Sequence, residues 1–314
     1  MQAYEMNIYE VNPNITTFYF GGDTDPDNPN LNVAVEDNWV VGACESLGVA
    51  SYAIHNGDAA LIYDTLCYPD QANLIRAHMS EKLGINKFTV AVSHWHLDHV
   101  GGNELYKDCN IIGTRKTREY MLRYKPEIEA GTLWGQPAIN PLREPDITFD
   151  TDVSVYLNGL EVRLYNFDIH TDDGLCAFIP KYKTLLPGDM LEDSASFVTN
   201  PEAIPAHVKN FKLLRELGVE KILPNHGRSF VIRDGGYDKE LIDCVEYYLN
   251  TLYTGLERDP DAKIAPLQEF LKPYFAKGLI HYWHPYETVH QNNTERVRAF
   301  FKNTWKSDGR LTAD

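Results

Sequence analysis

The six-residue segment HWHLDH, residues 94–99, limits more than any other stretch what this chain can fold into. Four of its side chains are good metal ligands. The segment 88–92 before it is apolar and β-branched, which predicts a buried strand, and the segment 100–106 after it is typical of a turn that enters a helix. The ligands are therefore predicted on a loop at the carboxyl end of a strand, where open α/β sheets bind their ligands.

The spacing within this segment indicates how the ligands divide. Alternate side chains of an extended loop share a face, so His94 and His96 can bind one cation together. Asp98 and His99 come next and can turn toward a second cation. Imidazole and carboxylate suit zinc, iron or manganese. Two such metals about 3.5–4 Å apart can share one hydroxide, so the segment is consistent with a dinuclear site.

Three further candidate ligands lie downstream, each at the end of an apolar run and beside glycine or proline. His170 lies in the segment DIHTDDG, Asp189 in LLPGD and His226 in ILPNHG. Glycine and proline mark turns, so each of these side chains is predicted on a loop that could reach the same cluster.

This motif and its three partners, in this order, resemble the metallo-β-lactamase superfamily over about residues 48–227. The resemblance implies seven ligands for two metals: His94, His96 and His170 for the first, Asp98, His99 and His226 for the second, and Asp189 bridging both. It also implies that Asp64, which follows a predicted strand, supports the ligands from behind. A helix N-cap is the alternative for that aspartate.

The resemblance further implies a four-layer αβ/βα sandwich, with two mixed sheets face to face, helices outside and the metals at one rim. The strand and helix patterns alone indicate only an α/β or α+β fold. After residue 234 the pattern becomes helical, with helices expected over 237–256, 265–275 and 294–305. We therefore predict a catalytic domain over residues 1–234 and a C-terminal helical extension over 235–314 that packs on it.

Three residues are candidates for contact with a substrate. The proline-rich segment 125–145 is predicted to be a lid or binding loop, and its Trp134 could form a wall of the site or lie in the core. Phe197 follows Asp189 closely in the sequence. His290 belongs to an aromatic and histidine-rich stretch that could line the cleft, although packing between helices is the alternative.

The motif and the resemblance together predict a dinuclear metal-dependent hydrolase, with zinc expected and iron, manganese or mixed metals as alternatives. A metal-bridging hydroxide would cleave a small ester, lactone, thioester, amide or phosphoester, and Asp98 would pass the proton to the leaving group. A mononuclear iron oxidoreductase similar to persulfide dioxygenases is one alternative, and a β-lactamase-type amide hydrolase is another. A binding protein without activity comes last, and the sequence does not identify the substrate.

Charge and composition bear on partners and location. The formal net charge of −16 argues against nucleic acid and anionic membranes as partners. No apolar run can span a bilayer, and the first residues lack the features of a signal peptide. The five scattered cysteines are expected to be reduced thiols. We therefore expect a cytoplasmic protein with a small-molecule substrate, which could form a homodimer through the aromatic residues of its extension.

Overall fold

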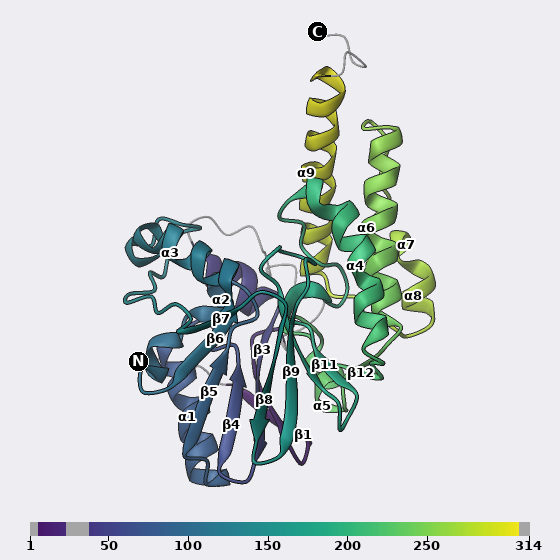
Figure 1. The fold of residues 1–314 in the computed structure, drawn as a ribbon. Helices are drawn as coiled ribbons and strands as arrows, with labels where there is room; N and C mark the ends of the chain where they lie inside the picture. Colours follow the sequence, from purple (N-terminus) through teal and green to yellow (C-terminus); the bar gives the residue numbers. More distant parts are fainter. Residues whose placement is uncertain (1–5, 23–37, 308–314) are drawn as a thin grey trace.

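The computed structural model describes residues 6–22 and 38–307, in which two sheets pack face to face (Figure 1). The first sheet has the strand order β1 (Asn7–Asn12), β2 (Ile15–Phe20), β3 (Val49–Asn56), β4 (Ala59–Tyr63), β5 (Lys87–Ala91), β6 (Asn110–Thr114) and β7 (Ile147–Phe149). The second has the order β13 (Tyr237–Asp238), β12 (Lys221–Ile222), β11 (Thr184–Leu186), β10 (Leu175–Ile179), β9 (Leu160–Asn166) and β8 (Asp152–Leu157). The predicted sandwich of two sheets with helices is confirmed.

The helices belong to two groups on opposite sides of the sheets (Figure 1). The longer helices are α1 (Pro69–Leu83), α3 (Arg115–Ala130), α4 (Ile204–Glu216), α6 (Leu241–Arg258) and α9 (Pro285–Ser307). The short ones are η1 (Val40–Ser46), α2 (Leu97–Val100), η2 (Asn103–Tyr106), η3 (Gly188–Met190), η4 (Pro201–Ala203), α5 (Ser229–Arg233), α7 (Leu267–Phe270) and α8 (Lys272–Ala276). α1 and α3 pack on the first sheet, whereas α4, α6 and α9 pack together beside the second.

The alternation of side chains along each strand assigns them to the two cores. Leu61 of β4 belongs to the core between the sheets, together with Leu164 of β9, whereas the next residue, Ile62, belongs to the core beneath α1 and α3. Successive side chains of a strand point to opposite faces, which is why one apolar run can serve both cores. β4 is buried along its whole length because it lies between neighbours and is covered on both faces.

Parallel strand pairs bring the functional loops to one rim. β4, β5 and β6 are parallel neighbours in the first sheet, and β11 and β12 are parallel neighbours in the second. The carboxyl ends of parallel strands meet at the same edge of a sheet. In Figure 1 α2 and α3 lie on one side of this rim, and α4, α6 and α9 lie on the other.

Some predicted boundaries are wrong. α3 continues through Pro126 to Ala130, so the first part of the segment 125–145 is helical. Proline has no N–H group, so the carbonyl of Leu122 lacks its helical partner, but Leu122 is an exposed residue that water can reach. The helix expected over 237–256 starts only at Leu241, because residues 237–238 pair with β12 as β13. The last helix starts at Pro285, well before the expected residue 294, and proline is favoured in a first helical turn.

The cysteines also differ from the expectation. A disulfide joins Cys44 of η1 to Cys67 in the loop after β4, so the expectation that all five are reduced thiols is wrong for this pair. Cys109, Cys176 and Cys244 are free. The pairing depends on η1 lying against that loop in three dimensions, which the scattered positions of the cysteines in the sequence do not reveal.

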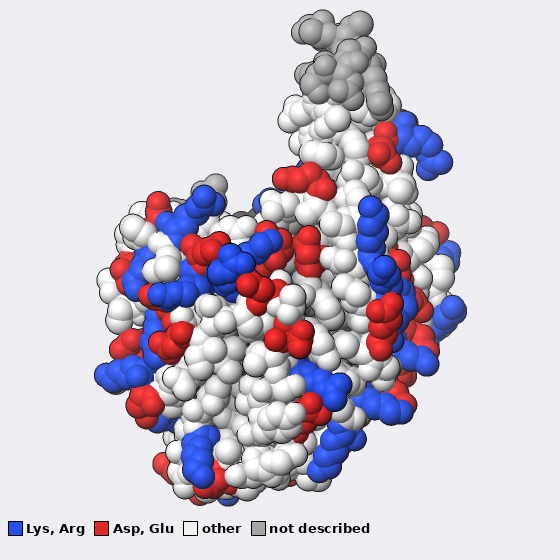
Figure 2. All heavy atoms as spheres, viewed as in Figure 1, with Lys and Arg blue, Asp and Glu red and all other residues white. Residues whose placement is uncertain are grey.

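The surface carries charges of both signs. On the face shown in Figure 2, lysine and arginine side chains are interspersed with aspartate and glutamate. Across residues 6–22 and 38–307, no helix has both the length and the apolar composition needed to cross a bilayer.

Candidate metal centre

All seven predicted ligands lie at the rim where the parallel strands end. The loop after β5 carries His94 and His96, and α2 follows it with Asp98 and His99. The remaining ligands come from the loop between β9 and β10, from η3 after β11, and from the loop after β12: His170, Asp189 and His226.

The two glycines after the motif allow this segment to lie close to the loop that follows β4 and to α1. A Cβ atom on Gly101 would lie 2.2 Å from the carbonyl oxygen of Cys67, and one on Gly102 would lie 2.3 Å from Cβ of Ala72. The amide of Gly101 donates to the carbonyl of Leu66 at 2.8 Å. Only glycine permits this approach, which fixes the position of the two ligands in α2.

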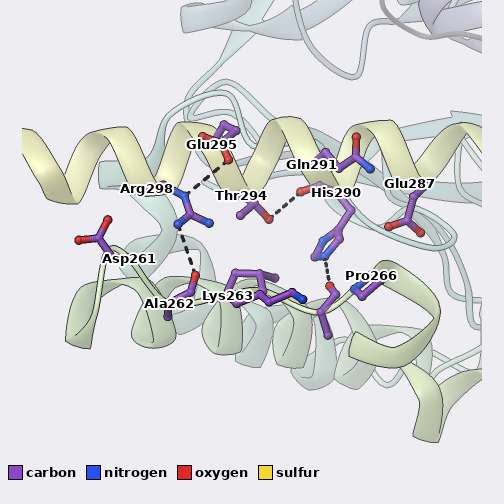
Figure 3. A pocket seen from close by; sticks show the side chains of 12 residues that line it. Asp261, Ala262, Lys263, Pro266, Glu287, His290, Gln291, Thr294, Glu295 and Arg298 are labelled. Atoms are coloured by element: carbon purple, nitrogen blue, oxygen red, sulfur yellow. Dashed lines mark hydrogen bonds and ion pairs between the residues drawn. The ribbon is translucent and has the colours of Figure 1, made fainter.

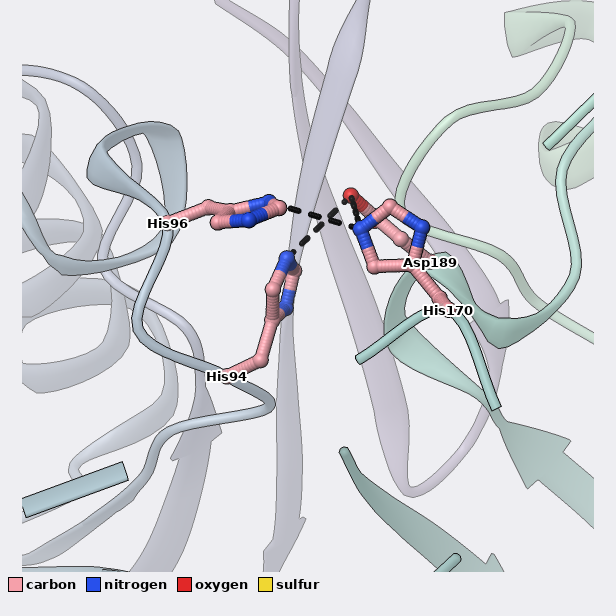
Figure 4. Close-up of side chains that lie close together, drawn as sticks. All are labelled: His94, His96, His170 and Asp189. Atoms are coloured by element: carbon pink, nitrogen blue, oxygen red, sulfur yellow. Dashed lines mark hydrogen bonds and ion pairs between the residues drawn. The ribbon is translucent and has the colours of Figure 1, made fainter. Parts of the chain in front are cut away.

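The first group of ligands is His94, His96, His170 and Asp189, whose ligand atoms lie within 4.8 Å of one another (Figure 4). Nε2 of His170 lies 3.3 Å from Nδ1 of His96. Oδ2 of Asp189 lies 3.5 Å from Nε2 of His94 and 3.8 Å from Nε2 of His170. The four side chains converge from three separate segments on one small space, as ligands of one cation would.

The second group is Asp98, His99 and His226, which meet the same distance criterion. Oδ2 of Asp98 lies 3.1 Å from Nε2 of His226 and 3.4 Å from Nε2 of His99. Oδ2 of Asp189 also reaches this group, at 3.2 Å from Nε2 of His99 and 3.5 Å from Nε2 of His226. One carboxylate oxygen thus lies between the two groups, which is the arrangement of a bridging ligand.

Backbone carbonyls fix the orientation of two histidines. Nδ1 of His226 lies 2.6 Å from the carbonyl oxygen of Gly48, and Nδ1 of His170 lies 3.2 Å from that of Phe197. A carbonyl can only accept, so Nδ1 carries the proton in both rings. In the neutral form of each ring, Nε2 then has a lone pair that faces the cluster, as a metal ligand requires.

The carboxylate of Asp64 fixes the orientation of His99. Its Oδ2 accepts from Nδ1 of His99 at 2.9 Å and from Nδ2 of Asn225 at 2.8 Å, and its Oδ1 accepts from the amide of Ser93 at 2.7 Å. The carboxylate is fully buried. α1 begins only at Pro69, so Asp64 is not its N-cap and instead contacts a predicted ligand from behind.

The ionisation of the first ligand group suits a cation, whereas in the second group the negative charges of Asp189 and Asp98 outweigh burial and raise the pKa of His99 and His226. Burial, with the nearby His170, lowers the pKa of His96 to about 3, and burial lowers that of His170 to about 4. These rings are therefore neutral and can donate a lone pair to a metal. Within the described part of the chain, Nε2 of His94, Nε2 of His99 and Oδ1 of Asp189 are buried without a hydrogen-bond partner. Such atoms are costly unless a ligand satisfies them, so the residues fit two metal ions.

A cleft of about 390 Å³ lies over the cluster. Its floor is formed by ligands, namely His96, Asp98, His170, Asp189 and His226. Its walls are largely apolar and include Trp39, Leu47, Trp134, Phe197 and Val289. Trp134 is 47% exposed, and the centre of its ring lies 5.2 Å from that of His96. The structure thus brings two of the three candidate substrate residues, Trp134 and Phe197, to the cleft.

His290 is not brought to this cleft. It lines a separate pocket of about 410 Å³ between α9 and the segment 261–266 (Figure 3). Its Nδ1 lies 3.1 Å from the hydroxyl of Tyr248, and its Nε2 lies 2.9 Å from the carbonyl oxygen of Ala265. Both ring nitrogens have hydrogen-bond partners outside the cleft. This arrangement agrees with packing between helices, the alternative expected for His290.

Sequence reasoning missed a buried aspartate that supports the motif. Asp173 accepts from the amide of Trp95, between the first two ligands, at 3.0 Å and from the hydroxyl of Thr117 in α3 at 2.9 Å. It therefore ties the loop that carries His94 and His96 to α3. The acidic pair in DIHTDDG was a signal that could have pointed to it.

A second missed residue is Glu192, which lines the cleft. It accepts from the amide of Phe197 at 3.0 Å and from the hydroxyl of Tyr286 in α9 at 3.1 Å. Burial, and then the negative charge of Asp189, raise the pKa of Glu192 above its ordinary value. Its position three residues after Asp189 was the only signal in the sequence.

Comparisons with known proteins agree with this geometry. A family model described as the Metallo-beta-lactamase superfamily matches residues 46–226. "Beta-lactamase-like protein 2 homolog" from Drosophila melanogaster is 25% identical over 218 residues, which are 65% of this chain and 64% of that protein. A metallo-beta-lactamase from Pontibacter korlensis has a TM-score of 0.58 at 16% identity, over 78% of this chain and 99% of the other. The DIM-1 metallo-beta-lactamase has a TM-score of 0.57 at 16% identity, over 79% and 98%.

Proposed function

This chain belongs to the metallo-β-lactamase superfamily, and we propose that it is a hydrolase that uses two metal ions, with zinc the metal expected. The observation that carries the proposal is the position of Asp189. One of its oxygens lies 3.2–3.8 Å from ring nitrogens of both ligand groups. A carboxylate in this position could hold two cations close together, and two adjacent metals suit a hydrolase.

The chain's own residues have separable roles in this proposal. Bound at the two groups, the metals would supply Lewis acidity and lower the pKa of a coordinated water. Asp98 lies at the floor of the cleft, where its carboxylate can accept a proton from water and return it to the leaving group. Burial raises the pKa of Asp98, but the neighbouring His99 and His226 outweigh this and hold it well below its ordinary value, so the carboxylate stays ionised.

The cleft supports a small substrate with an apolar portion. Its volume of about 390 Å³ is in the range of small-molecule sites, and aromatic and aliphatic side chains form its walls. An ester, lactone, thioester, amide or phosphoester could present its reacting bond to the floor. The β-lactamases among the solved structures share under 25% identity with this chain, so they support the fold and leave the substrate open.

Metal content is the first test of this proposal. We expect freshly purified, untagged protein to contain about two zinc ions, or a mixed pair, per chain by elemental mass spectrometry. Removing them with a chelator should lower ester hydrolysis by at least about 100-fold, because the metals supply the Lewis acid, and added zinc should restore it. One iron per chain with no second metal would favour the iron oxidoreductase. If the protein binds neither metal even when zinc or iron is supplied in excess, both the hydrolase and the iron oxidoreductase are contradicted.

Trp134 is predicted to be a substrate wall. We expect Trp134→Ala to raise KM for an aryl ester about tenfold with little change in kcat, because the ring offers apolar contact at the cleft but is none of the predicted metal ligands. Trp134→Phe should retain most of the affinity. Steady-state kinetics would check this, with Tyr156→Ala, which removes an exposed aromatic ring from β8, as the control. An unchanged KM in Trp134→Ala would remove the residue from the substrate site.

A further inference from the structure

One face of α9 forms a wall of the cleft over the metal centre. Val289, Asn292 and Arg296 all line that cleft. Their spacing of three and four residues places them on the same side of a helix. α9 lies outside residues 46–226, so this wall is a feature of the chain beyond the part that the family model matches.

Hydrogen bonds hold this face of α9 against the metal centre. Oδ1 of Asn293 accepts from the amide of Val198 at 2.8 Å, and its Nδ2 donates to the carbonyl of Ser196 at 2.9 Å. Between these two residues lies Phe197, whose carbonyl oxygen is the partner of Nδ1 of His170. The helix is therefore fixed to the backbone segment that also orients a predicted metal ligand.

Arg296 offers a positive charge at the cleft. Its guanidinium carbon lies 4.8 Å from the centre of the Phe197 ring, a cation–π contact that places the charge beside the cleft. Among the described residues, no carboxylate lies within 4.0 Å of its nitrogens, and it is the only lysine or arginine that lines the cleft. Arg298, two residues further on, is different because it donates to the carbonyls of Pro260 and Ala262.

The chemistry of this wall indicates what it can bind. A guanidinium group presents donors in a planar fork that matches the oxygens of a carboxylate or phosphate. Asn292, one turn earlier on the same face, adds an amide donor. Val289 continues the wall as an apolar surface. The order along the helix is thus apolar, polar and cationic.

We propose that Arg296 and Asn292 bind an anionic carboxylate or phosphate group of the substrate, so that the cleft selects amphipathic anions. The reacting bond would lie at the floor, the apolar body between Trp134 and Val289, and the anionic end at α9. This proposal rests on the proposed hydrolase function. It assigns substrate selection to a residue remote from the metal ligands in the sequence.

A matched pair of esters tests the proposal on the metal-loaded, full-length protein. Monomethyl suberate carries one carboxylate, and dimethyl suberate is its neutral counterpart. Binding is measured by quenching of tryptophan fluorescence, since Trp39 and Trp134 line the cleft, and turnover by release of methanol. Arg296→Gln removes the charge and the fork. Lys302→Gln, which removes an exposed charge from the same helix, is the control.

We expect Arg296→Gln to weaken binding and kcat/KM for the monoester about tenfold or more, and to leave the diester within about twofold. Lys302→Gln should leave both unchanged. A carboxylate that instead reached the metals would bind equally in the wild type and in the variant, so the difference between the proteins reports on α9. The comparison is repeated with an ester that carries a phosphate in place of the carboxylate. The preferred anion is the one for which Arg296→Gln causes the larger loss of binding.

The two proposals fail separately. If Arg296→Gln weakens both esters equally or neither, or if the wild type does not bind the monoester, the anion site is overturned. If the protein hydrolyses both esters without a preference for the charged one, the hydrolase proposal is supported and the anion site is contradicted. Charge-selective binding that Arg296→Gln abolishes, in a protein that hydrolyses none of the esters, would keep the anion site and contradict the hydrolase.

Discussion

Replacing Asp98 with alanine is expected to lower turnover by at least about 1,000-fold, the largest effect of any single substitution considered for this chain. The change removes a ligand of the second metal group and also the carboxylate that would carry the proton. Oδ2 of Asp98 contacts Nε2 of His226 and of His99, at 3.1 and 3.4 Å, both of which belong to the cluster. The apolar cores do not depend on it, so the fold should persist.

Kinetics on metal-loaded protein and thermal unfolding by circular dichroism would separate these effects. Asp98→Asn keeps the shape of the side chain but cannot accept the proton, and it should be nearly as inactive as the alanine variant. Glu81→Ala, which removes an exposed carboxylate from α1, is the control for the loss of one negative charge. If Asp98→Ala kept wild-type turnover, the proposed mechanism would be wrong.

Replacing Asp64 with asparagine is expected to lower metal affinity at the second group by about 10- to 100-fold without changing any ligand. Asp64 accepts hydrogen bonds from Nδ1 of His99, Nδ2 of Asn225 and the amide of Ser93. The amide group of asparagine cannot accept from all three donors, so His99 can be forced into the tautomer that puts a proton on Nε2. That nitrogen would then be unable to bind a metal.

Asparagine is preferred to alanine for this test because the backbone of residue 64 has a φ of +62°, which Asn and Asp tolerate better than other side chains. Dialysis against zinc buffers, followed by elemental analysis, would give the affinity. Activity lost at limiting zinc should return in excess zinc, which a merely unstable variant would not show. Asp152→Asn, exposed at the start of β8, serves as the control. Unchanged zinc affinity in Asp64→Asn would contradict the supporting role.

The candidate metal centre could be predicted from the sequence because the residues that form it come with strong local signals. Four of the seven lie within residues 94–99, and His170, Asp189 and His226 each follow an apolar run at a glycine or proline turn. Parallel strands then bring such loop positions to one rim, as the pairing of β4 with β5 and of β11 with β12 shows. In this part of the chain, local pattern and long-range packing agree.

The cleft walls and several boundaries could not be predicted, because they depend on contacts between distant segments. Glu192 meets Tyr286, and Val198 meets Asn293, each across more than 90 residues. Helical periodicity shows that α9 has an apolar face but not which element covers it. The short strand β13 forms only because β12 is available to pair with it. His290, which the aromatic stretch suggested as a substrate residue, packs instead against Tyr248.

The attachment of α9 to the sandwich that carries the candidate metal centre has a consequence for how such a protein can change. Reactive groups reside on the loops at the strand ends, whereas Val289, Asn292 and Arg296 reside on a single helix that contributes no ligand. Substitutions on that one helical face could redirect substrate preference while the reactive machinery stayed intact. Variation during evolution, or randomisation of these three positions in the laboratory, could therefore explore new substrates at little risk to catalysis.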